Sequence, residues 1–189
     1  MRKQLKVKKY NPEWAYEFDV IKKVYLRFLS KLDLEILHVG STSIKDCYAK
    51  PIIDIDVVLK NFSDFAEIKE LFISLGYIHE GNKGIKDREV FTRKTERVPL
   101  FSSNTYKFCH HVYVLPVDSL PLKNHLLFKD YLLAHPQEIE VYGNLKLDSL
   151  RKGLTREKYA INKTEYIMGI LKKAGLSEFH LELIRKENT

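Results

Sequence analysis

The 189-residue sequence lacks several features that mark whole classes of protein. No stretch approaches about 20 consecutive apolar residues, so no membrane-spanning helix is expected. The basic segment 1–6 has no apolar core and does not resemble a secretory signal. Only two cysteines occur, Cys47 and Cys109, which are too few for a disulfide framework and do not form a metal-ligand pair by spacing. We therefore expect a cytoplasmic protein with two reduced thiols and no membrane partner.

The sequence also has no internal repeat, no low-complexity tract and no dense block of one charge. Its 32 basic and 25 acidic residues leave a net charge of +7, spread along the chain. Such an excess favours anionic partners, whether nucleotides, nucleic acid or an acidic protein, but a solvated basic surface also explains it. With 44% hydrophobic residues, the chain can build a core of its own.

The pattern of apolar residues predicts an α+β protein. Helices are expected where apolar residues recur at three- and four-residue steps, and strands where short apolar runs are bounded by turn residues. Strands come early and helices late, which indicates a mixed sheet followed by a C-terminal helical tail. We expect a core of residues 1–118 and a helical region of residues 119–189 packed on it, unless the two form one domain overall. The expected helices are 12–30, 64–75, 119–133, 137–152, 162–174 (opened by a capping box at Asn162) and a short one after Ser177, and the expected strands are 34–39, 51–59, 77–79, 89–94 and 106–115.

The most informative stretch covers residues 38–59. Its first part places a Gly40-Ser41 turn after an apolar run. Glycine allows the backbone to approach a ligand closely, and exposed N–H groups with a serine hydroxyl can hold phosphate oxygens. Its second part places Asp54 and Asp56 two residues apart in an apolar strand, so both project from one face of the sheet. Two adjacent carboxylates there are costly unless a cation neutralises them. Together the two parts predict a site for a divalent metal and a phosphate.

These residues resemble the signature of a known family. The matching stretches are His38-Val39-Gly40-Ser41-Thr42-Ser43 and, after a short loop, Lys50-Pro51-Ile52-Ile53-Asp54-Ile55-Asp56-Val57. They are similar to the GrpB family within the nucleotidyltransferase superfamily, and further resemblance at 10–14, 88–94, 110–114, 128–136 and 142–147 extends it over nearly the whole chain. The resemblance implies a nucleotidyltransferase-like mixed β-sheet flanked by helices. It also implies Mg²⁺ (or Mn²⁺) held by Asp54 and Asp56, beside a nucleoside triphosphate.

The sequence departs from the pattern in two places. The loop has Lys45-Asp46 where the family usually has Pro-Gly, which adds charge beside the site, and the more important departure is the third carboxylate. Active nucleotidyltransferases generally carry a third carboxylate on a later strand, but the matching strand here has His110 and His111 and no acidic residue. Glu89 lies on the preceding hairpin and Asp118 just beyond the strand. If the strand is regular, its two histidines point to opposite faces, and we favour His111 as the one that reaches the site as a metal ligand or base.

Several further residues are candidates for holding a phosphate. Lys50 either binds phosphate or pairs with an aspartate, and His38 either contacts the substrate or closes the turn. The charged residues of the hairpin, Arg88, Arg93 and Lys94, form either a phosphate clamp or a solvated face. In the tail, Tyr159 and Lys163 lie where they could cover the sheet, although helix lysines usually face solvent. The predicted phosphate-binding set is Gly40, Ser41, Thr42, Ser43, Lys50, Arg93 and His38.

The leading hypothesis is a GrpB-like protein that binds a nucleoside triphosphate with Mg²⁺ and transfers a nucleotidyl group to an unknown hydroxyl acceptor. Asp54, Asp56 and His111 would carry the catalysis. The alternative is a catalytically degenerate module that binds a nucleotide or coenzyme without transfer, which the missing third acid favours. RNA binding through the basic surface ranks last, because the sequence has no recognised nucleic-acid motif.

Overall fold

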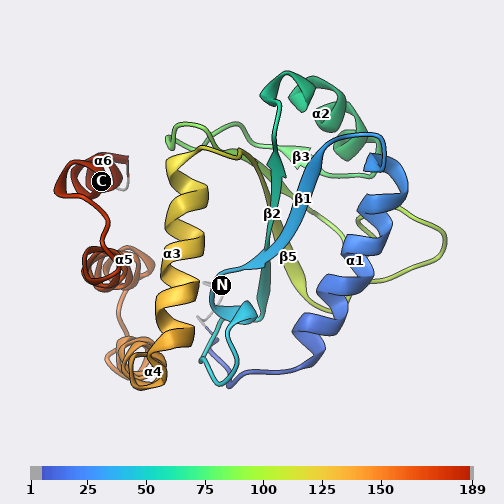
Figure 1. Cartoon of the computed structure of the whole chain (residues 1–189). Helices are drawn as coiled ribbons and strands as arrows, with labels where there is room; N and C mark the ends of the chain where they lie inside the picture. Colours follow the sequence, from blue (N-terminus) through green and yellow to red (C-terminus); the bar gives the residue numbers. More distant parts are fainter. Residues whose placement is uncertain (1–5, 188–189) are drawn as a thin grey trace.

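The computed structural model describes residues 6–187, so most of the basic segment 1–6 lies outside the described residues. Its centre is a five-stranded mixed sheet with the strand order β1-β2-β5-β4-β3 (Figure 1). β2 runs parallel to β5, and the other neighbouring pairs are antiparallel. The strands are Leu34–Val39 (β1), Ile52–Leu59 (β2), Ile78–His79 (β3), Glu89–Thr92 (β4) and Cys109–Pro116 (β5).

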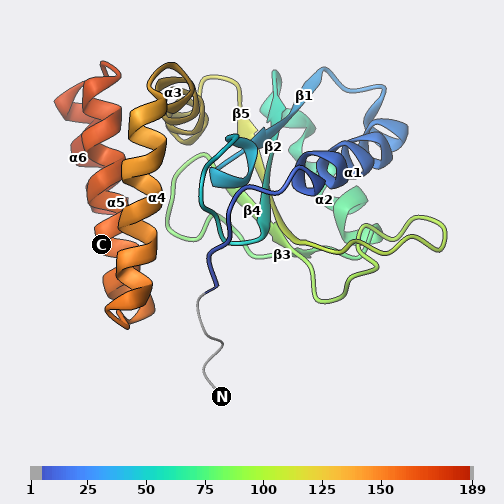
Figure 2. The same ribbon diagram turned by 90° about the horizontal axis from the view of Figure 1, so that it is seen from below.

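Six α-helices flank the sheet within the described chain. α1 and α2 lie on one side of the sheet and α3 on the other, with α4, α5 and α6 stacked beyond α3 (Figure 1, and from below in Figure 2). The mixed α+β architecture expected from the sequence is therefore confirmed, whereas the domain boundary at residue 118 stays a prediction. The helices are Glu13–Leu29 (α1), Phe65–Ser74 (α2), Leu120–Ala134 (α3), Pro136–Arg151 (α4), Arg156–Lys173 (α5) and Glu178–Glu187 (α6).

The main core fills the space between the sheet and the helices α1 and α2. Alternate residues of β2 and β5 are fully buried there, because successive side chains of a strand point to opposite faces. They pack against the apolar face of α1, whose Trp14 and Ile21 are also fully buried. A second core joins the helices α3 to α6 to the segment that follows β1, through Ile44 and Cys47. The chain between β1 and β2 is thus held between the sheet and the helical region.

Two element boundaries differ from the expectations by three residues or more. α5 begins at Arg156 rather than at Asn162, because the Thr155 hydroxyl accepts a hydrogen bond from the Lys158 N–H and caps the helix earlier. β5 begins at Cys109 rather than at residue 106. The carbonyl oxygens of residues 106 and 108 accept hydrogen bonds from the Arg93 guanidinium instead.

No helix in the described part of the chain combines the length and apolarity needed to cross a membrane.

Candidate functional site

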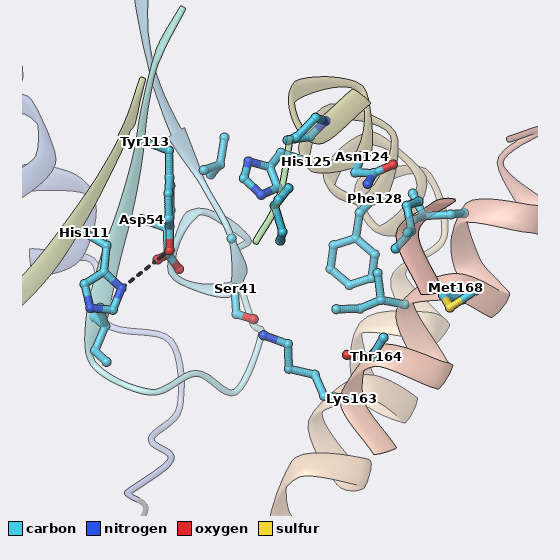
Figure 3. Close-up of a pocket in the computed structure, with 18 of the residues that line it drawn as sticks. Ser41, Asp54, His111, Tyr113, Asn124, His125, Phe128, Lys163, Thr164 and Met168 are labelled. Atoms are coloured by element: carbon cyan, nitrogen blue, oxygen red, sulfur yellow. Dashed lines mark hydrogen bonds and ion pairs between the residues drawn. The ribbon is translucent and has the colours of Figure 1, made fainter. Parts of the chain in front are cut away.

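A cavity of about 440 Å³ lies where the ends of β1, β2 and β5 face the helices α3 to α6. Its sheet side carries Asp54, His111 and Tyr113, and its helix side carries Phe128 and Met168 (Figure 3). A pocket of this size fits a small organic ligand, since such sites typically measure about 300–1,000 Å³. The sheet side is polar, and the helix side combines apolar residues with Lys146, Lys163 and Glu187, so the cavity suits a ligand with a charged part and an apolar part.

The Gly40-Ser41 turn forms the floor of the cavity next to Asp54. Gly40 has a φ of +68°, and a Cβ built on it would lie 2.6 Å from the Asp54 Oδ2 atom. Both the left-handed backbone and this close approach require glycine. After the turn, Ser43 donates from its hydroxyl to the Gly40 carbonyl at 2.8 Å. The buried Thr42 hydroxyl donates to the Ile52 carbonyl at 3.2 Å, which ties the turn to the start of β2.

Asp54 lines the cavity and has two partners from β5. The Tyr113 hydroxyl donates to its Oδ1 at 3.2 Å, and the His111 Nδ1 lies 3.6 Å from the same oxygen. Burial raises the pKa of the Asp54 carboxyl, but His111 together with the charge of Lys163 lowers it more, so the net pKa lies below its usual value. Asp54 is therefore an ionised carboxylate at neutral pH.

Asp56 lies deeper on the same face and is 0% exposed. Its Oδ2 accepts a hydrogen bond from the His125 Nδ1 of α3 at 2.8 Å. Its Oδ1 is also buried and has no hydrogen-bond partner among residues 6–187. Burial raises the pKa of Asp56, although His125 opposes this. One carboxylate oxygen beside Asp54 is thus left without a polar partner.

The two neighbouring histidines of β5 point to opposite faces of the sheet. His111 is paired in register with Asp54 and lines the cavity. His110 is fully buried on the opposite face, where its Nε2 lies 2.5 Å from the Tyr77 hydroxyl. Burial lowers the pKa of His110 to about 3, so it is neutral. Cys109, the exposed first residue of β5, precedes both.

Sequence reasoning missed Lys146 of α4, a lysine only 2% exposed that lines the cavity behind the turn. Its Nζ donates to the Tyr48 carbonyl at 2.6 Å and to the Ser41 Oγ at 2.8 Å, and it lies 3.6 Å from the centre of the Tyr142 ring. A signal for it exists in the sequence. Ile139, Tyr142 and Lys146 follow at three- and four-residue steps, which places a lysine on the buried face of a helix.

Further cationic side chains reach the cavity from three directions. Lys50 lies 4.4 Å from the centre of the Tyr159 ring of α5, and Lys163 of the same helix points toward Ser41 (Figure 3). Arg88, from the loop before β4, lies 5.4 Å from the Tyr113 ring. With Lys146, four lysine or arginine side chains line the cavity, against the two acidic residues Asp54 and Glu187. This excess of positive charge favours an anionic ligand.

Several predicted site residues lie away from the cavity. His38 points to the other face of the sheet, where it stacks on Phe18, and its Nε2 lies 3.0 Å from the Thr42 hydroxyl, so it closes the turn. Burial lowers the pKa of His38 to about 4. The Arg93 guanidinium is directed at backbone carbonyls and holds a loop rather than a phosphate. The residues that line the cavity include neither these two nor Ser43, Lys94, Glu89 and Asp118, and the fully buried Asp56 is not among them either.

The donor set fits a divalent cation in part. No group of three or more His, Cys, Asp or Glu side chains arranged to hold a metal occurs among the described residues. Magnesium, however, is commonly bound by one or two carboxylates together with substrate phosphates and water. Asp54 and Asp56 offer two carboxylates on one face of β2. Asp54 lines the cavity, and the buried Oδ1 of Asp56, which has no partner among residues 6–187, is the oxygen that a cation would use. Glu89 does not complete the set, because it pairs with His79 at 2.6 Å.

The fold and the site together describe a mixed α+β protein with a Gly-Ser turn beside two strand aspartates. Residues 4–173 match the family model described as GrpB protein, and the chain belongs to this family. Among its relatives, UPF0157 protein YqkA of Bacillus subtilis is 31% identical over 77% of this chain, which spans only 39% of that relative's length. Glutamate-rich protein GrpB of Alkalihalophilus pseudofirmus is 29% identical, with 86% of this chain and 91% of the relative covered.

A solved structure is similar as well. The crystal structure of conserved protein GrpB from Enterococcus faecalis superposes with a TM-score of 0.74 at 28% sequence identity. The similarity covers 89% of this chain and 96% of that chain. The relation therefore includes the sheet and most of the helical region.

Proposed function

We propose that the cavity binds a nucleoside triphosphate together with one divalent cation, Mg²⁺ or Mn²⁺, and that the protein transfers a nucleotidyl group to a hydroxyl acceptor. The observation that carries the proposal is the buried Oδ1 of Asp56, which lacks a hydrogen-bond partner among residues 6–187 and lies on the same face as Asp54. A buried carboxylate oxygen without a partner is costly, and a cation would remove that cost. The positively charged lining supports a polyphosphate as the second component.

The residues of the chain would divide the work as follows. Asp54 and Asp56 would hold the cation, which supplies charge neutralisation and orientation of the phosphates. The Ser41 hydroxyl, Lys163 and Arg88 would contact phosphate oxygens. His111 would accept the proton of the acceptor hydroxyl. In the transfer, the bond from the acceptor oxygen to the α-phosphorus forms, and the bond to the pyrophosphate oxygen breaks, so that pyrophosphate leaves with the electron pair.

Isothermal titration with ATP, GTP, CTP and UTP, each with Mg²⁺, tests binding. We expect at least one to bind, and we expect the affinity to be lost in the Asp54→Ala/Asp56→Ala double variant. Lys129→Met is a matched control, because Lys129 donates to the His38 carbonyl at 2.9 Å and does not line the cavity. No binding of any of the four, or equal binding by the double variant, would contradict the proposal.

A second candidate is a binding module without turnover. It is favoured by the absence, in the described residues, of a third acidic side chain grouped with Asp54 and Asp56 to hold a metal, and by the histidine that pairs with each aspartate. Release of pyrophosphate from the bound triphosphate in the presence of a pool of hydroxyl compounds separates the two. Release that depends on Asp54 supports transfer, and binding without release supports the module.

A further inference from the structure

Lys146 lies inside the protein with all of its donor capacity directed at the Gly-Ser turn and the loop behind it. An ammonium group has three N–H donors. Its acceptors are the Tyr48 carbonyl at 2.6 Å, the Ser41 Oγ at 2.8 Å and the Cys47 Sγ at 3.5 Å. No donor is left for a ligand in the cavity. Lys146 can therefore influence a ligand chiefly through the groups that it holds.

Among these groups, Ser41 faces the cavity. Because Lys146 donates to the Ser41 oxygen, the single hydrogen of the serine hydroxyl points away from Lys146, toward Tyr142, the Cys47 sulfur or a ligand. A hydroxyl whose oxygen already accepts from an ammonium is also polarised and becomes a better donor. Ser41 is thus arranged as a hydrogen-bond donor at the end of the turn.

The cost of burying the ammonium indicates that it has a specific task. Burial, with the nearby charges of Lys163 and Lys50, lowers the pKa of Lys146 to about 8. Removing a charge from water is expensive unless it is well paired. The Tyr142 ring, 3.6 Å from Nζ, and the two oxygen acceptors offset this cost. A methionine would fill the same space without the cost.

We propose that Lys146 is a positioning residue for phosphate recognition. It holds the Ser41 hydroxyl so that the serine donates to a phosphate oxygen of the bound triphosphate. The inference rests on the proposed function, because it assumes that a triphosphate occupies the cavity. The inference assigns α4, a helix of the C-terminal region, a part in phosphate binding. The Gly-Ser turn and the two aspartates alone would give that helix no such part.

A double-mutant cycle tests whether Lys146 acts through Ser41. The variants are Lys146→Met, Ser41→Ala and the double variant, and the measurement is the Kd of ATP with Mg²⁺ and the Kd of adenosine. We expect each single variant to weaken ATP binding about tenfold, the typical effect of a hydrogen bond to a charged group. The double variant should be no weaker than the weaker single variant, because both remove the same contact. Adenosine, which has no phosphate, should bind all variants equally.

The control and the alternative outcomes separate a positioning role from a structural one. Lys129→Met removes another partly buried lysine and should leave both affinities unchanged. If Lys146→Met does not fold by circular dichroism, Lys146→Gln keeps a donor for the Tyr48 carbonyl and replaces it in the cycle. Strictly additive losses, an equal loss for ATP and adenosine, or unchanged ATP binding would overturn this inference alone. Failure of the wild-type protein to bind ATP and inorganic triphosphate would overturn the proposed function as well.

Discussion

The two faces of β2 and β5 are made by the same strands and have opposite characters. On the face toward α1, β5 contributes His110, which joins Tyr77 and Tyr25 in a hydrogen-bonded chain inside the aromatic core. On the face toward α3, the next residues along each strand contribute Asp54 and His111 to the wall of a cavity. One face is filled and neutral, whereas the other is hollow and charged.

This contrast indicates that the face toward α3 is the one that can bind a ligand. Polar groups in the filled face stabilise packing, and burial keeps His110 neutral by lowering its pKa to about 3. Among residues 6–187, buried polar atoms without a partner occur on both faces, but that of the filled face in His110 is a ring nitrogen, whereas that of the hollow face in Asp56 is a carboxylate oxygen. Substitutions on the first face should change stability, and substitutions on the second should change ligand binding.

The largest effect is expected at Gly40, where one change disturbs both stability and the site. In Gly40→Ala, the positive φ costs about 1–2 kcal/mol, and overlap of the new Cβ with Asp54 adds about 1–3 kcal/mol. Urea unfolding measures the loss, and titration with ATP and Mg²⁺ should show weaker binding because Asp54 must move. Gly81→Ala is the matched control, since Gly81 has the same φ of +68° but nothing within 4 Å of its Cβ. Equal losses in both variants would contradict the close-approach argument.

A smaller effect is expected from removing one tyrosine hydroxyl from each face. Tyr77→Phe leaves the Tyr25 hydroxyl and His110 without their partner in the core and should cost about 1–3 kcal/mol of unfolding free energy. Tyr113→Phe removes a partly exposed donor to Asp54 and should change stability by less than about 0.5 kcal/mol. Titration with ATP and Mg²⁺ should show the larger loss of affinity for Tyr113→Phe and the smaller loss for Tyr77→Phe. The comparison of faces fails if Tyr113→Phe proves the more destabilising.

The smallest effect is a pH dependence that belongs to the filled face. Burial lowers the pKa of folded His110 to about 3 from an ordinary value of 6.5. Between these values the unfolded chain binds a proton that the folded chain does not, so stability falls as the pH falls below about 6.5. One histidine contributes at most about 1.4 kcal/mol per pH unit to the slope of the unfolding free energy against pH.

Urea unfolding at pH 7, 6 and 5 measures this slope. His110→Gln should reduce it without abolishing it, since burial also lowers the pKa of His38, to about 4. An unchanged slope in the variant would show that His110 is protonated in the folded state.

Local patterns in the sequence are sufficient to predict the sheet wall of the site. The two-residue period of a strand places Asp54 and Asp56 on one face, and the same period separates His111 from His110. Which strands become neighbours is a long-range property. The parallel register that sets Asp54 beside His111 joins residues 57 positions apart, and no local pattern contains it. Arg93 shows the converse error. The basic hairpin predicts a phosphate contact for it, but its guanidinium donates to four backbone carbonyls of the following loop.

The helical wall could be predicted only in part. Lys146 and His125 lie at core positions of α4 and α3, and a polar residue at such a position is a detectable anomaly. Its partner is not detectable, since Lys146 binds Ser41 from 105 residues away. The misplaced start of α5 has a local cause. Thr155 and Asn162 both offer a cap, and the capping box at Asn162 is the stronger sequence signal, but the helix begins after Thr155.

Cys109 begins the strand that carries His111 and Tyr113, and the alternation of side chains directs it to the same face. It is exposed, whereas Cys47 is fully buried and burial raises the pKa of its thiol. A thiol-reactive dye should therefore attach at Cys109 in the unmodified chain and leave Cys47 unlabelled. The protein thus carries its own attachment point for a fluorescent reporter, on the charged face and two residues before His111, through which the arrival of a ligand can be timed.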